Sequence, residues 1–131
     1  NYESTYKPLA NRYSVGEHAS FIHVKMQVAA LQQVIKWTPE AIQKYCKEIT
    51  KEAVLELQEI GCFIEKSEDR THHLFGIKLP DTVNVEKLKT ALKVANIFIS
   101  FRGSYIRLSC HLYNTKEDFK ALVTCIKTAM N

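Results

Sequence analysis

The sequence predicts an α+β fold, in which helices pack on one face of a small, mostly antiparallel sheet of about four strands. Long stretches with apolar residues every three or four positions indicate amphipathic helices. Shorter stretches that alternate polar and apolar residues between turn signals indicate strands. The expected order is helix, helix, strand, strand, helix, strand, strand, helix, without an internal repeat.

Length and composition exclude several classes of protein. The 131 residues, 46% of them apolar, are enough for one hydrophobic core. The net charge of +4 comes from 18 basic and 14 acidic residues mixed along the chain, which disfavours nucleic acid as a partner. No apolar run approaches the roughly 20 residues that span a bilayer, and no signal peptide is recognisable. We therefore expect a cytoplasmic protein without a membrane partner.

The cysteines and histidines show no metal-ligand spacing, so no metal site is expected. The cysteines are instead predicted to be small buried hydrophobic residues in a reducing compartment. They are Cys46, Cys62, Cys110 and Cys125.

The chain opens at Asn1 with a polar, irregular stretch that has no apolar period. We expect residues 1–18 to connect to a missing large domain, and residues 19–131 to form a single α+β C-terminal domain.

Two helices are expected first. Residues 20–37 carry apolar side chains at helical spacing along one broad face. Thr38, Pro39 and Glu40 then supply an N-cap, a proline at the first helical position and an acid at the positive end of the helix dipole. Gly61 is placed to end this second helix.

The middle of the chain predicts two strands and a third helix. Residues 62–64 are a short strand candidate, residues 65–71 form a charged turn, and residues 72–79 form a second strand that Pro80 ends. Asn84 is expected to cap a helix whose apolar residues follow a 3-4-3 spacing.

A hairpin and a last helix complete the prediction. Residues 97–102 and 105–111 alternate in polarity, and Gly103 with Ser104 between them forms a hairpin turn. The polar face of the second strand carries Arg107, Ser109 and His111. Asn114 or Thr115 is expected to cap the final helix, with Asp118 completing a capping box.

Residues 107–115, Arg-Leu-Ser-Cys-His-Leu-Tyr-Asn-Thr, together with Lys-Glu-Asp up to residue 118, resemble the C-terminal signature of class V aminotransferases. These fold-type I pyridoxal-phosphate enzymes include cysteine desulfurases, kynureninase-like lyases and the isopenicillin N epimerase-like group, to which the pattern is most similar. Residues 11–18 resemble the segment by which that family enters its small domain. The resemblance implies the small C-terminal domain of a dimeric enzyme that acts on an amino acid.

Three residues match family positions. Arg107 resembles the arginine that binds the substrate α-carboxylate, a role suited to the planar guanidinium fork. Arg102 matches a second arginine near the active-site mouth, where it adds an anion contact or simply shapes the turn. Ser20 matches a small hydroxyl residue that reaches the cofactor phosphate, although a plain helix N-cap explains it equally well. For Arg107, the structural alternative is a solvated or salt-bridged strand residue.

The departures from the family pattern also matter. The segment between Arg102 and Arg107 lacks the persulfide-forming cysteine of desulfurases, so sulfur mobilisation through it is not expected. The lysine that binds pyridoxal phosphate belongs to the missing domain in this resemblance, so no catalytic residue is expected here and the isolated chain is expected to be inactive. The alternative is a free-standing α+β module that binds a small anionic ligand or a protein partner.

Overall fold

The computed structural model describes residues 5–13 and 21–130, and these divide between two compact units, residues 1–36 and 37–131. The first unit contains a 3-10 helix, η1 (Leu9–Tyr13), and most of helix α1 (Phe21–Trp37); neither helix buries a side chain. The expected boundary at residue 18 and the candidate Ser20 lie outside the described residues, and the division into residues 1–18 and 19–131 stays a prediction.

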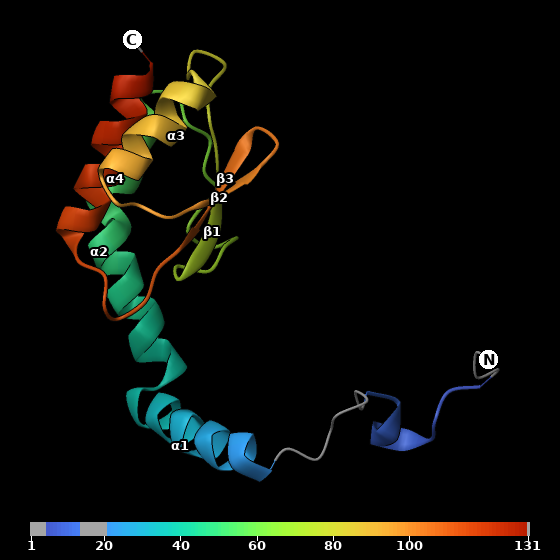
Figure 1. Ribbon diagram of the computed structural model, residues 1–131. Helices are drawn as coiled ribbons and strands as arrows, with labels where there is room; N and C mark the ends of the chain where they lie inside the picture. The colour runs from blue at the N-terminus through green and yellow to red at the C-terminus, as the bar shows by residue number, and fades with distance from the viewer. Residues whose placement is uncertain (1–4, 14–20, 131) are drawn as a thin grey trace. The chain divides into compact units, whose positions relative to one another are not determined.

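The second unit confirms the predicted α+β fold. Its helices are α2 (Pro39–Glu59), α3 (Val85–Val94) and α4 (Lys116–Ala129). Its strands are β1 (Leu74–Lys78), β2 (Ser100–Arg102) and β3 (Tyr105–Ser109). The strands form an antiparallel sheet in the order β1-β3-β2, and the three helices cover one face of it (Figure 1).

The described residues form a sheet of three strands rather than about four. The expected strand at residues 62–64 is reduced to one bridge, in which Phe63 and Lys78 exchange backbone hydrogen bonds of 3.0 and 2.9 Å. The N–H of Cys62 instead donates to the carbonyl of Leu57 at 2.9 Å and closes the end of α2. The chain therefore leaves the end of α2 only just before Phe63, and its pairing with β1 is a single bridge.

The core lies between the sheet and the helices. Ile77 on β1 and Ile106 on β3 are fully buried, as are Leu88 on α3 and Ile126 on α4. The alternation of β1 and β3 is strict, with every second residue buried. Each of these strands therefore has one face that stabilises the fold and one that is free to bind.

The local helix signals are confirmed. Thr38 Oγ1 accepts the N–H of Ala41 at 3.2 Å, and Asn84 Oδ1 accepts two N–H groups at the start of α3. Thr115 and Asp118 form the capping box of α4, in which the Thr115 N–H donates to Asp118 Oδ2 at 3.0 Å. These contacts satisfy backbone donors that the first turn of a helix leaves unpaired.

Candidate functional site

The candidate site is the outer face of the sheet, opposite the helices. Directly opposed residues in an antiparallel pair share a face. Arg107, in the middle of the central strand, lies opposite Gly76 on β1 and Ser100 on β2. Arg102 lies opposite Tyr105, two residues along the same face of β3. Both predicted arginines are therefore on one exposed face.

This face is cationic and lacks acids. Lys78, opposite Tyr105, joins Arg102 and Arg107, whereas the outward positions of the three strands contain no carboxylate. None of the three basic side chains forms an ion pair or hydrogen bond with a residue in the ranges 5–13 and 21–130. Within the described part of the chain, Arg107 is therefore an exposed strand residue without a salt bridge, as in its solvated alternative, and its predicted role in binding stays a prediction.

A shallow depression of about 210 Å³ lies beside Arg107. Its lining consists of Phe98, Ile99, Ser100, Arg107 and Ser109. Two serine hydroxyls and one guanidinium thus border the same space. A guanidinium fork donates two parallel hydrogen bonds to a carboxylate, and hydroxyls add further donors. The depression is chemically suited to a small carboxylate.

The residue opposite Arg107 on the neighbouring strand is a glycine that the ring of Tyr105 lies against. Gly76, directly across from Arg107, has no side chain, and a Cβ there would lie 3.4 Å from Cδ1 of Tyr105. The Tyr105 ring therefore lies close to the glycine backbone. Larger side chains at position 76 would compete with this ring for space.

The structure separates the predicted site residues. Arg107 lines the depression, whereas Arg102 lies at the end of β2 beside Gly103, which has φ +60° in the hairpin turn. Ser20 lies outside the described residues, so its predicted cofactor contact stays a prediction. Sequence reasoning placed Ser109 on the same face as Arg107 but assigned neither Ser109 nor Ser100 to the site; the register that sets Ser100 opposite Arg107 is the signal that points to Ser100.

The second half of the Arg-to-Thr motif has a structural role. Asn114 Oδ1 accepts the N–H of His111 at 3.0 Å, and its Nδ2 donates to Asp118 Oδ2 at 3.1 Å. The Asn114 carbonyl accepts the hydroxyl of Tyr45 on α2 at 2.9 Å. Asn114 thus joins the end of the sheet to α4 and α2, and thereby fixes the strand that carries Arg107.

His111, which the sequence places on the polar face with Arg107, lies near two aromatic rings. Its ring centroid lies 6.2 Å from that of Trp37 and 6.1 Å from that of Tyr113. The residue follows the end of β3 and is half-buried, so it does not line the depression beside Arg107. The packed interpretation of this histidine fits its surroundings.

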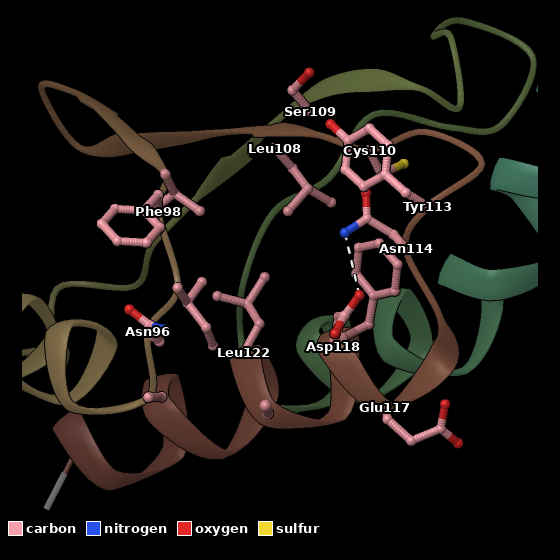
Figure 2. Close-up of a pocket in the computed structure, with 15 residues that line it drawn as sticks. Asn96, Phe98, Leu108, Ser109, Cys110, Tyr113, Asn114, Glu117, Asp118 and Leu122 are labelled. Atoms are coloured by element: carbon pink, nitrogen blue, oxygen red, sulfur yellow. Dashed lines mark hydrogen bonds between the residues drawn. The ribbon is translucent and has the colours of Figure 1, made fainter.

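A second pocket of about 540 Å³ lies between residues 95–99, the end of β3 and the first half of α4 (Figure 2). Leu108 and Leu122 point into it, and the exposed side chains of Phe98 and Tyr113 lie at its edge. The amide of Asn114 is hydrogen-bonded to Asp118 there. The surface of the pocket is therefore mainly apolar, and the side chains of Asn114 and Asp118 in its lining are hydrogen-bonded to each other.

The thiols are protected from reaction. Burial raises the pKa of Cys110 to about 12, with a further increase from nearby Cys46, and its Sγ donates to the carbonyl of His72 at 3.3 Å. All four cysteines are free and buried, as predicted. Among residues 5–13 and 21–130 there is no group of three or more metal-ligating side chains, and no helix is long and apolar enough to cross a membrane.

The fold and this sheet face define an α+β domain whose exposed sheet face is cationic. No family model and no curated protein matches the sequence. Among solved structures, a NifS-like protein aligns with a TM-score of 0.55 and 18% sequence identity, over 68% of this chain and 28% of that chain. The chain thus spans little more than a quarter of that protein. The likeness supports an aminotransferase-like fold, and the isopenicillin N epimerase-like group stays a prediction.

Proposed function

We propose that this chain is the small C-terminal domain of a pyridoxal-phosphate-dependent enzyme of the class V aminotransferase family, and that Arg107 binds the α-carboxylate of an amino-acid substrate. The observation that carries the proposal is the unpaired guanidinium of Arg107 beside a depression with two serine hydroxyls. The fold likeness to a NifS-like protein supports it. In this proposal the chain also forms part of a homodimer interface in the cytoplasm and is inactive alone.

The outer sheet face fits the anionic end of a substrate better than the cofactor ring. It offers guanidinium and hydroxyl donors, but no carboxylate that would pair with a pyridinium nitrogen. Pyridoxal phosphate, when bound, supplies an electron sink for bonds at the substrate α-carbon. We propose that the domain preceding Asn1 holds the ring and its lysine, with Ser20 of this chain contacting the phosphate.

Within this proposal, the residues of this chain bind and orient the substrate. Arg107 donates two parallel hydrogen bonds to the carboxylate, and a rigid fork of this kind fixes the direction of the amino acid as well as its position. Ser100 and Ser109 lie next to the guanidinium and can donate to the same group. Arg102 increases the positive potential at the edge of the site.

The first test is the change of Arg107→Ala in the parent protein. Because the variant loses a bidentate charged contact, we expect kcat/KM to fall roughly 30- to 900-fold. This fall corresponds to a loss of about 2–4 kcal/mol in transition-state stabilisation. Arg107→Lys should recover only part of the loss, since an ammonium cannot reproduce the planar fork. We expect borohydride reduction of the same samples, followed by peptide mass spectrometry, to find the cofactor on a lysine upstream of Asn1.

The matched control is Lys78→Gln, which removes one positive charge from the same face but lies outside the depression. We expect this control to change kcat/KM by less than about threefold, because exposed charges contribute little. Equal losses for Lys78→Gln and Arg107→Ala would contradict a specific carboxylate contact. Unchanged kinetics for Arg107→Ala would remove its proposed role altogether.

The alternative function is a free-standing module that binds a small anionic ligand or a protein partner. The observation that favours it is the charge of the whole outer face, where Lys78 adds to the two arginines without an acid nearby. This alternative requires a natural chain that takes up no pyridoxal phosphate. The reduction experiment therefore separates the two proposals.

A further inference from the structure

Two acidic and two basic residues of α2 lie on different sides of the helix. Glu52 and Glu56 form ion pairs with lysines of α4. Lys47 and Lys51, also four residues apart, instead line a groove between α2 and residues 65–72. Neither lysine has an ion-pair partner in the described part of the chain. Like charges at this spacing repel each other weakly, and an anion bound between them would remove this repulsion.

The opposite wall of this groove is also basic. Residues 65–72 contribute Lys66, Arg70 and His72, while Glu65 is the single acidic residue of the lining. The groove has a volume of about 260 Å³. Two segments that are distant in sequence therefore place basic side chains around one small space.

Arg70 is held in position before any ligand arrives. Its Nε donates to the carbonyl of Glu65 at 3.0 Å and its Nη1 to that of Thr71 at 3.2 Å. The guanidinium carbon lies 4.1 Å from the ring centroid of Phe75, a cation–π contact. Within residues 5–13 and 21–130, Nη2 has no hydrogen-bond partner. Arg70 thus offers a fixed donor at a low cost in conformational entropy.

His72 is also anchored and senses the positive charge. Its backbone N–H donates to Gln43 Oε1 on α2 at 2.7 Å, which ties the segment to the helix. Burial lowers the pKa of its ring, and Arg70 and Lys47 lower this pKa further. The positive charges of Arg70 and Lys47 therefore add to the effect of burial in disfavouring a protonated His72, and a bound anion would oppose both effects.

The floor of the groove is apolar. Val54 and Leu55 line it, and the Leu55 side chain is 53% exposed. The volume lies just below the range of about 300–1,000 Å³ typical of drug-sized ligands. A compact ligand with one strongly anionic group and a short apolar part matches these dimensions.

We propose that this groove is a binding site for a small phosphomonoester, whose phosphate lies among Lys51, Lys66 and Arg70 and whose carbon portion packs on Val54 and Leu55. A phosphomonoester carries a charge of about −1.5 to −2 at pH 7 and three acceptor oxygens, which suits several cations better than one carboxylate does. The site belongs to α2 and residues 65–72, and is distinct from the sheet face that carries Arg107.

The test is a titration of the isotope-labelled full chain with phenyl phosphate, followed by two-dimensional amide NMR. We expect saturable shifts confined to residues 47–58 and 65–72, displacement by inorganic phosphate, and none of these shifts with phenol. Binding should also raise the pKa of His72, because a bound anion stabilises the imidazolium. No saturable shift, or shifts centred on residues 100–109, would overturn the proposal without affecting the proposed role of Arg107.

The double variant Lys51→Gln with Lys66→Gln tests the assignment, since both side chains are exposed and their loss should leave the fold intact. We expect affinity for phenyl phosphate to fall by about tenfold or more, as charge-assisted contacts are lost. The matched control, Lys93→Gln with Lys120→Gln, makes the same change in net charge outside the groove. Equal weakening in both double variants would reduce the interaction to general charge attraction and overturn the proposed site.

Discussion

The two faces of β3 differ sharply in burial and in polarity. On the inner face, Ile106 and Leu108 are buried against the helices. On the outer face, Arg107 and Ser109 are exposed, and within residues 5–13 and 21–130 their side chains form no hydrogen bond or ion pair. We therefore expect substitutions at the inner positions of β3 to lower the stability of the fold and leave binding unchanged. Substitutions at the outer positions should weaken binding and leave stability unchanged.

The largest expected difference between the faces concerns thiol reactivity. A Ser109→Cys variant places a thiol on the outer face, one residue before buried Cys110. Because the pKa of Cys110 is raised from 9.0 to about 12, its thiolate population at pH 8 is about a thousandfold smaller than that of an ordinary thiol. We expect iodoacetamide to alkylate position 109 rapidly and Cys110 only slowly, as measured by peptide mass spectrometry.

The raised pKa also predicts how the reactivity of Cys110 changes with pH. Its thiol stays protonated at neutral pH, and its reactivity increases only as the pH approaches 12. Unfolding in urea is the control, since it should make all the cysteines equally reactive. Similar native rates at positions 109 and 110 would contradict the contrast between the two faces.

The second test compares the stability effects of adjacent residues. Ile106→Ala should lower the free energy of unfolding by about 2–5 kcal/mol, because it leaves a cavity at a fully buried site. Arg107→Ala should change it by less than about 0.5 kcal/mol, because its side chain is exposed and unpaired. Urea unfolding followed by circular dichroism measures both. A large destabilisation by Arg107→Ala would assign that residue to the structure rather than to binding.

The smallest expected change in stability concerns a lysine that has an acidic partner. Lys127 Nζ lies 2.8 Å from Glu56 Oε2 across the α2–α4 interface, in contrast to the unpaired Arg107. A double-mutant cycle with Lys127→Gln and Glu56→Gln should give a coupling energy of about 0.2–1 kcal/mol, as exposed ion pairs are partly screened. This coupling should decrease in high salt. A coupling of zero at low salt would show that proximity alone does not identify a structural ion pair.

Local sequence signals predicted much of the fold because their causes are local. The cap at Asn84 and the box of Thr115 with Asp118 depend on contacts over two or three residues, and each formed as expected. Alternation with a period of two was likewise enough to place Arg107 on the polar face. The sequence also led to the α+β class, since the order of helices and strands restricts the possible packings.

The candidate sites depend on contacts that sequence patterns do not contain. The depression beside Arg107 requires the register that sets Ser100 across from it, and the basic groove requires α2 to lie against the segment that contains Arg70. Residues 62–64 had the composition of a strand, but in the structure they follow directly on the end of α2 and form one bridge to Lys78.

The sequence by itself therefore determined the type of each main element and the side of the strand that carries Arg107, because backbone capping and side-chain alternation act within a few residues. Among the described residues, the tertiary structure alone decided which cations have an acidic partner: Lys127 meets an acid 71 residues away, whereas the strand partners of Arg107 are Gly76 and Ser100. Pairing across such separations follows from register and packing, and it is this pairing that distinguishes a structural charge from one available to a ligand.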